Sequence, residues 1–185
     1  MSDSTKQALA DSLKKLASRK PLEKITVKDI VEDCNVNRQT FYYHFQDIYD
    51  LLDWMFKTDA GKLVDQSITM DNIGDYTVKV YEYLLANKTM VLNIYNSLSR
   101  SELSKYLENI SYPSIRNMVA QQAEGMNVSD ENINIIAITY TYGFIGIIMQ
   151  WLDNKMKMDY EIDRDKFLAI LSAGVTESLK KLSGT

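Results

Sequence analysis

The sequence predicts an all-α protein of about nine helices, and three observations lead to that prediction. First, the 185 residues include only 7 glycines and 2 prolines, so few residues interrupt a long helix. Second, apolar residues recur at helical spacing, as Leu9, Leu13 and Leu16 do near the N-terminus. Third, no segment shows the regular alternation of apolar and polar residues that predicts a β-strand.

The cysteine and histidine counts exclude several classes of protein. Cys34 is the single cysteine, so the chain forms neither an internal disulfide nor a multi-cysteine metal site. His44 is the single histidine, which leaves little for a paired-histidine metal centre or a catalytic triad. We therefore expect no metal, no cofactor and no enzymatic activity. The first twenty residues lack the apolar core of a signal peptide, so a cytoplasmic location is expected.

The first domain, residues 1–46, is predicted to contain three helices. Apolar spacing places the first helix from about Ser4 to Arg19. Thr26 and Asp29 have the spacing of a capping box, in which a threonine oxygen and an acidic side chain satisfy free N–H groups where a helix begins. The second helix is therefore expected from Val27 to about Asp33.

The next residues predict a tight turn and a third helix. Asn35 suits the left-handed backbone of such a turn, and Asn37 is a good cap for a helix from Arg38 to about His44. Phe41 and Phe45 are four residues apart and share one face of that helix, so we expect both in the core. Two short helices joined by a tight turn form a helix-turn-helix.

The second domain, residues 47–185, is predicted to contain the remaining helices. Asp47 is expected to cap the fourth helix, which would extend to about Ser67. Pro113 is expected to kink or split a longer helix, because proline lacks the N–H that continues the hydrogen-bond ladder. The helices after the fourth are predicted at about residues 76–87, 89–98, 101–123, 130–157 and 163–182.

The helix predicted at residues 130–157 has no charged residue between Asn132 and Leu152. It is long enough to cross a membrane, yet its asparagine, threonine and tyrosine residues are too polar for a lone span. A helix that is apolar on most sides must be buried on most sides, and a partner subunit would cover it. We therefore expect a homodimer and no membrane span. The residues expected at the dimer interface are Gly143, Gly146, Ile147, Ile148, Trp151, Phe167, Ile170, Leu171 and Val175.

Whether the chain can bind nucleic acid depends more on where its charged residues lie than on its net charge. A net charge of -4 argues at first sight against nucleic acid, because phosphate neutralisation needs lysine and arginine. However, residues 14–28 carry a net charge of +5, and residues 29–53 carry -5. We call residues 14–28 the basic strip. Charge alone leaves two interpretations open, contact with phosphate and an ordinary solvated helix face.

The segments ITVKDIV at residues 25–31 and CNVNRQTFYYHF at residues 34–45 resemble the DNA-binding region of the TetR family of bacterial transcription regulators. The resemblance covers about residues 5–56. It implies a homodimer that binds double-stranded DNA at a palindromic operator, with a C-terminal helical bundle for dimerisation and effector sensing. The RQTFY segment and the tyrosine-rich C-terminal domain also resemble a subgroup that includes activators of dihydroxyacetone-kinase operons, where the signal can come from a partner protein.

A recognition helix presents its first turn to base edges, so Arg38, which suits guanine, and Gln39, which suits adenine, are the candidates for base readout. The resemblance implies that Tyr42 and His44 contact the phosphate backbone. Thr26 as a simple cap and the tyrosines as packing residues are the alternatives. The complete set of expected DNA-binding residues is Lys24, Thr26, Lys28, Asn37, Arg38, Gln39, Thr40, Tyr42, Tyr43 and His44.

The sequence departs from the family pattern just after Phe45. Members commonly have a lysine there for phosphate, whereas this chain has Gln46 and Asp47, so modest affinity for each half-site is expected. That departure favours an alternative function, a helical co-regulator that signals through a partner protein with weak or auxiliary DNA binding. The effector is open between a small molecule and a protein. The residues expected to line an effector pocket are Tyr76, Tyr81, Tyr83, Tyr95, Tyr106, Tyr140 and Met149.

Overall fold

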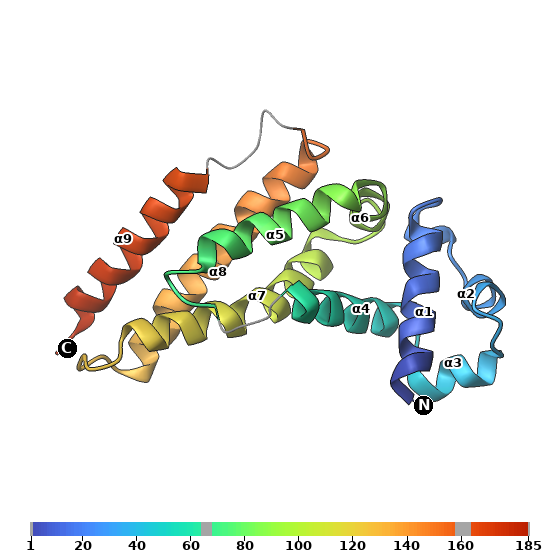
Figure 1. Ribbon diagram of the computed structural model, residues 1–185, viewed down its shortest axis with the longest axis horizontal. Helices are drawn as coiled ribbons and strands as arrows, with labels where there is room; N and C mark the ends of the chain where they lie inside the picture. The colour runs from blue at the N-terminus through green and yellow to red at the C-terminus, as the bar shows by residue number, and fades with distance from the viewer. Residues whose placement is uncertain (1, 64–67, 158–163, 185) are drawn as a thin grey trace. The chain divides into compact units, whose positions relative to one another are not determined.

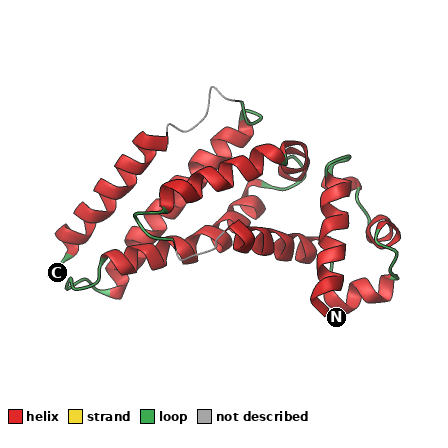
Figure 2. Ribbon diagram, viewed as in Figure 1, coloured by secondary structure: helices red, strands yellow, loops and turns green. Residues whose placement is uncertain are grey.

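The computed structural model describes residues 2–63, 68–157 and 164–184, and every regular element in these ranges is helical (Figure 1, Figure 2). The prediction of an all-α fold is confirmed. The first α-helices are α1 (Ser2–Ala17), α2 (Val27–Asp33), α3 (Arg38–His44) and α4 (Ile48–Leu63), with a short 3-10 helix at Leu22–Lys24. They are followed by α5 (Ile73–Ala86), α6 (Lys88–Tyr95), α7 (Arg100–Gln122), α8 (Asp130–Asp153) and α9 (Arg164–Leu182).

The helix ends agree with the sequence prediction for α2 and α3 and differ for later helices. α8 ends at Asp153, because Lys155 and Met156 have φ values of 56° and 53°, which a right-handed helix does not allow. Pro113 lies inside α7 and does not split it. Asn109, whose carbonyl loses its helical partner to Pro113, is exposed, so water can bond to that carbonyl. The end predicted for the fourth helix, at about Ser67, lies outside the described residues.

The chain divides into two compact units. Unit 1 comprises Met1–Lys62 and Tyr83–Leu103, and unit 2 comprises Leu63–Glu82 and Ser104–Thr185. Helices α5 and α7 each contribute residues to both units. Unit 1 thus holds all of α6 and nearly all of α4 together with the first three helices. The domain boundary predicted between residues 46 and 47 stays a prediction.

The core of unit 1 contains Phe41 of α3 and Phe45, the residue that caps the end of α3. Phe41 and Phe45 are 0% and 3% exposed, as their spacing predicted. The centre of the Phe45 ring lies 6.0 Å from that of the Trp54 ring of α4. The Lys6 ammonium of α1 also lies 6.0 Å from the centre of the Phe45 ring. Phe45 thus joins α3 to both α1 and α4. The surrounding core includes Leu9, Leu13, Ile30, Leu51, Leu52 and Met55, all fully buried.

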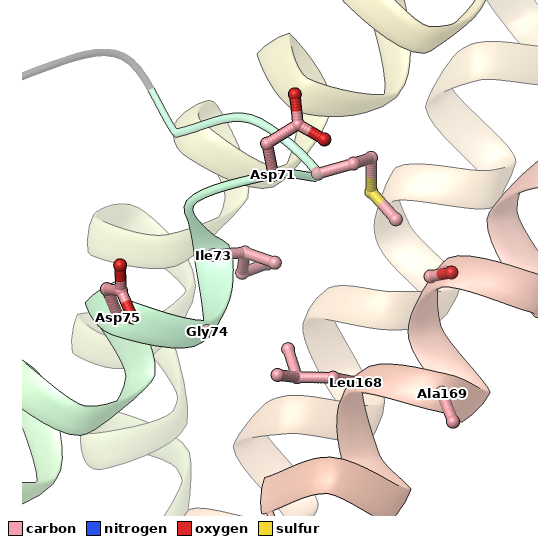
Figure 3. A pocket seen from close by; sticks show the side chains of 8 residues that line it. Asp71, Ile73, Gly74, Asp75, Leu168 and Ala169 are labelled. Atoms are coloured by element: carbon pink, nitrogen blue, oxygen red, sulfur yellow. The ribbon is translucent and has the colours of Figure 1, made fainter.

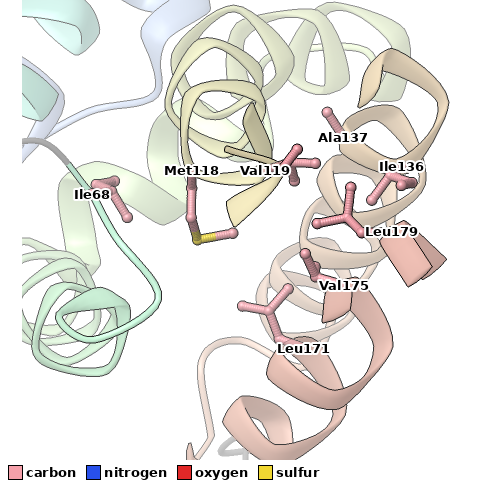
Figure 4. Packing of buried hydrophobic residues seen from close by; sticks show 9 residues of the cluster. Ile68, Met118, Val119, Ile136, Ala137, Leu171, Val175 and Leu179 are labelled. Atoms are coloured by element: carbon pink, nitrogen blue, oxygen red, sulfur yellow. The ribbon is translucent and has the colours of Figure 1, made fainter. Parts of the chain in front are cut away.

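The core of unit 2 joins α7, α8 and α9, whose apolar side chains point toward one another in Figure 4. It contains Ile68, Met118, Val119, Ala123, Ile136, Ala137, Leu171, Val175 and Leu179. Two of these residues correct the predicted dimer interface. Leu171 and Val175 are 4% and 0% exposed, because they pack inside their own chain and leave no surface for a partner.

Two predicted interface residues of α8 are buried in the same way. Ile148 and Trp151 are 7% and 3% exposed, and Trp151 stacks on Tyr81 of α5 with ring centres 4.9 Å apart. Neither offers area to a second chain. Of the other predicted interface residues, Gly143, Gly146 and Ile170 are exposed, Ile147 is half-buried, and the Phe167 side chain lies outside the described structure.

Within the described ranges, α8 is the one helix whose length and composition would allow it to cross a membrane. A buried core helix has the same composition. Ile136, Ala137 and Ile145 are buried against other residues of this chain, as expected of a core helix.

Helices α8 and α9 approach closely where Gly174 faces Tyr140. A Cβ atom at residue 174 would overlap the Tyr140 hydroxyl oxygen. Gly174→Ala should therefore lower the free energy of unfolding by about 1–2 kcal/mol, after allowance for the better helix propensity of alanine. Urea unfolding at a fixed protein concentration measures the loss. Tyr140→Phe removes the overlapping atom and should recover part of it, whereas strictly additive effects in the double-mutant cycle would contradict the contact.

Candidate nucleic-acid interface

The N-terminus of α2 is closed by a reciprocal cap. The Asp29 N–H donates to Thr26 Oγ1 at 3.2 Å, and the Thr26 N–H donates to the Asp29 carboxylate at 2.8 Å. The Thr26 hydroxyl donates to the same carboxylate at 2.8 Å, and Lys20 forms an ion pair with it at 2.9 Å. The capping box predicted from the sequence is present.

These contacts lower the pKa of Asp29 to about 2. The hydrogen bond from the Lys20 ammonium is the largest cause, followed by those from the Thr26 N–H and hydroxyl. Asp29 is therefore ionised near neutral pH. Thr26 is exposed and acts as a cap in the free chain, whereas its contact with phosphate stays a prediction.

The turn and the start of α3 are held by two asparagines. Asn35 adopts the left-handed conformation expected in the turn, with a φ of 53°. Asn37 Oδ1 accepts hydrogen bonds from the Thr40 N–H at 2.7 Å and from the Thr40 hydroxyl at 3.0 Å. Two of the predicted DNA-binding residues, Asn37 and Thr40, therefore bond to each other and fix the first turn of α3.

One face of α3 carries four exposed side chains, Arg38, Gln39, Tyr42 and Tyr43. Their positions i, i+1, i+4 and i+5 form a continuous strip along the helix, opposite the buried Phe41. Tyr42 and Tyr43 are 59% and 82% exposed, so neither packs in the core of this chain. We call these four side chains the α3 face.

His44 lies at the edge of this face. It is half-buried, and its ring meets that of Tyr43 edge-on with ring centres 4.9 Å apart. The contact limits the positions that the exposed Tyr43 ring can take. The contact of His44 and Tyr43 with DNA stays a prediction.

Folding neutralises much of the basic strip. Lys15 pairs with Asp33 at 2.5 Å, and Lys28 pairs with Glu32 at 3.7 Å, in addition to the ion pair of Lys20 with Asp29. Acidic residues that follow the basic strip in sequence thus lie beside it in the folded chain. The net charge of residues 14–28 overstates the positive charge available to DNA. Lys24 is exposed at the end of the 3-10 helix and remains a candidate for phosphate contact.

Lys14 of the basic strip pairs at 2.6 Å with Asp59, a residue that the sequence prediction did not single out. Asp59 is only 5% exposed. The available signal was its position four residues after Met55, on the buried face of α4.

Comparison with known families identifies this arrangement. A family model described as bacterial regulatory proteins, tetR family, matches residues 9–55. A second model, described as a transcriptional regulator C-terminal region, matches residues 71–172, more than half of the chain. The chain belongs to the TetR family. It is therefore a sequence-specific DNA-binding transcription regulator, and membership points to a transcription factor that is not an enzyme.

Two relatives make the resemblance more specific. The dhaKLM operon transcriptional activator DhaS of Lactococcus lactis subsp. lactis (strain IL1403) is 33% identical over 63 residues, which are 34% of this chain and 34% of the relative. The match thus spans about a third of that relative's length. A solved structure of a dihydroxyacetone kinase operon activator DhaS has the same fold, with a TM-score of 0.67 and 18% identity over 97% of this chain and 98% of that one.

The predicted effector-pocket residues occupy several different environments in the TetR-family fold. Tyr76 and Tyr140 pack against the unit 2 core, Tyr81 stacks on Trp151, and Met149 is buried. Tyr83 donates to Asp59 of unit 1, and Tyr95 and Tyr106 are half-buried. An effector pocket at these positions stays a prediction.

Figure 3 shows a groove in unit 2 that none of the predicted effector-pocket residues line. It has a volume of about 330 Å³ and lies between the start of α5 and α9. The lining residues are Met70, Asp71, Ile73, Gly74, Asp75, Leu168, Ala169 and Ser172.

Thr26→Ala tests the cap of α2. The substitution should lower the free energy of unfolding by about 1 kcal/mol, and it should raise the pKa of Asp29 because two of its donors are weakened or lost. In the parent, the ionised Asp29 stabilises the fold above a pH of about 4, and this contribution is lost as the pH falls toward 2. Unfolding at several pH values and an NMR titration of the carboxyl carbon measure both effects. Thr26→Ser keeps the hydroxyl and serves as the control; equal pKa values of Asp29 in all three proteins would contradict the cap.

Proposed function

We propose that the chain acts as a cytoplasmic homodimer that regulates transcription from a palindromic operator. The recognition helices α3 of the two subunits would enter successive major grooves about 34 Å apart. The observation that carries the proposal is the α3 face, in which Arg38, Gln39, Tyr42 and Tyr43 are exposed while Phe41 anchors the opposite side. A helix of this kind can place its side chains against base edges without unfolding any of the core.

The proposed roles follow from the chemistry of each side chain. Arg38 and Gln39 lie in the first turn of α3 and read guanine and adenine edges. Tyr42 and His44 donate to phosphate oxygens and fix the register of the helix on the DNA, with Tyr43 beside them. The further proposed backbone contacts come from Lys24, Thr26, Lys28, Asn37 and Thr40.

The ion pairs of the basic strip permit these contacts. Lys28 and Glu32 are 61% and 65% exposed in their 3.7 Å pair, so solvent screens it strongly. Lys28 can therefore exchange that weak partner for a phosphate. The closer pairs of Lys15 and Lys20 support the expectation of modest affinity at each half-site.

Arg38→Ala should weaken binding to the operator by about 10- to 100-fold, the worth of one bidentate contact with a base. Fluorescence anisotropy with the DNA upstream of the protein's own gene measures the affinity. Arg38→Lys keeps the charge but lacks the planar fork, and it separates the two roles of the side chain. Full retention of affinity and sequence preference in Arg38→Lys would show that Arg38 contacts phosphate alone.

The second candidate function is a co-regulator that acts mainly through a partner protein. The closely paired lysines of the basic strip favour it, because they leave less positive charge for phosphate. In the leading proposal an effector, whether a small molecule or a protein, releases the dimer from the operator or repositions the helix-turn-helix segments of its two subunits. A steep loss of operator affinity with rising salt supports direct DNA binding, and a flat response supports the co-regulator.

The homodimer is proposed to form through the outer surface of α8 and α9. Ile135, Ile138 and Tyr142 of α8 are 59%, 45% and 47% exposed, and Ile170 of α9 is 70% exposed. Such large apolar side chains rarely gather on helices that face only water. Their spacing follows one side of α8, on which the exposed glycines Gly143 and Gly146 would allow a close approach of the partner.

Ile138→Asp should shift the protein from dimer to monomer, because it places a charge in the apolar interface. Sedimentation velocity across a range of protein concentrations measures the change. Tyr43→Glu is the matched control, since it places the same charge on a large exposed side chain of α3, outside the proposed interface. Dimers of equal stability in the parent and Ile138→Asp would refute the α8 surface as the interface.

A further inference from the structure

Asp59 is a buried acid of α4 that contacts α1 and the last turn of α5, which belongs to unit 1. Its side chain is 5% exposed on the otherwise apolar inner face of α4. Lys14 of α1 donates to Oδ1 at 2.6 Å, and the Tyr83 hydroxyl of α5 donates to Oδ2 at 2.5 Å. Lys62 lies farther away, 4.0 Å from Oδ1. We call Lys14, Asp59, Lys62 and Tyr83 the Asp59 cluster.

Lys14 and Tyr83 make different kinds of contact with Asp59. Lys14 supplies the positive charge that a buried carboxylate requires. Tyr83 supplies one directed hydrogen bond from a neutral hydroxyl, and burial together with the contact to Asp59 raises the pKa of Tyr83, so the hydroxyl keeps its proton. Removal of the Tyr83 hydroxyl therefore leaves the charge balance intact but removes a directional link between α5 and α4.

Helix α5 is anchored at this end in both units. Tyr81 stacks on the buried Trp151 of α8 within unit 2, and Tyr83 bonds to Asp59 within unit 1. Residues two apart on a helix project about 200° apart, so these side chains leave α5 on nearly opposite sides.

A second polar contact joins α1 to α6, which also belongs to unit 1. The Asn93 side-chain amide of α6 donates at 2.8 Å to the carbonyl oxygen of Ala17, the last residue of α1. Such a contact satisfies one of the free carbonyl groups where a helix ends. Helix α1 is thus held by Lys14 and Ala17, one turn apart, through residues that lie beyond the helix-turn-helix in sequence.

We propose that Tyr83 is a positioning residue, whose hydrogen bond to Asp59 fixes the orientation of the helix-turn-helix relative to α5. The inference rests on the proposed homodimer for its effect on DNA, because the helix-turn-helix segments of two subunits must match two half-sites. Loss of the hydrogen bond lets each helix-turn-helix change its orientation without altering the α3 face. The affinity for a full operator then falls, while the affinity for a single half-site stays the same.

Tyr83→Phe tests the proposal, since it removes the hydroxyl and keeps the ring. The affinity is measured for a half-site, for the operator, and for operators with one base pair added or removed between the half-sites. The parent should prefer the correct spacing by about tenfold or more, and Tyr83→Phe should reduce this preference to about two- to threefold. Tyr112→Phe is the matched control, because it removes a hydroxyl that donates to Asn134 at 3.2 Å within unit 2.

Two results would overturn the proposal. The first is an unchanged spacing preference in Tyr83→Phe. The second is an equal loss of affinity for the half-site and for every operator, which a merely structural role would produce.

A measurement without DNA separates this inference from the proposed function. Nitroxide labels at Arg19→Cys and Ala86→Cys, in a Cys34→Ser background, report the distance between the residues that follow α1 and the end of α5, both within unit 1. Dilution with unlabelled chains restricts the signal to one subunit. Electron–electron resonance should give a narrow distance distribution in the parent and a broader or shifted one in Tyr83→Phe. Identical distributions overturn the role of Tyr83, whatever the protein binds.

Discussion

The burial of Phe41 and Phe45 is the interaction on which the rest of unit 1 depends. Phe45 lies against Trp54 of α4 and beneath the Lys6 ammonium of α1, so one side chain holds α3 to both neighbours. A helix of seven residues has too little length to be stable alone. Because its inner side is anchored, its outer side can remain fully exposed, and that exposure allows a recognition helix to meet base edges.

The positive charge that this protein can offer to DNA depends on which lysines are paired with acids, and not on the net charge of each segment. The sequence sets a basic segment before an acidic one, and the fold interleaves them through the pairs of Lys15 with Asp33 and of Lys20 with Asp29. The Lys20 pair lies at the start of α2 and lowers the pKa of Asp29, whereas the Lys15 pair lies at the end of α2 and lowers the pKa of Asp33. The same pairs reduce the charge available for phosphate. On the proposed function, specific contacts of the α3 face would therefore carry more of the recognition than a general attraction to DNA.

The two ends of α5 serve different parts of the molecule. Its first residues belong to unit 2, and the Tyr83 hydroxyl belongs to the Asp59 cluster of unit 1. The orientation of a buried carboxylate such as Asp59 is set by a few short hydrogen bonds, so the loss of one of them changes it.

The sequence by itself determined the helical class and the bounds of α2 and α3, and it indicated the residues of the α3 face. Capping boxes, a left-handed asparagine and aromatic residues four apart act over a few residues, so local sequence suffices to recognise them. Only the tertiary structure decided which apolar residues of α8 and α9 are buried, which lysines are paired, and that Asp59 meets Tyr83. Leu171 and Ile170 are adjacent and equally apolar, yet one is buried and the other exposed. Contacts between residues distant in sequence make that choice, and local sequence does not contain them.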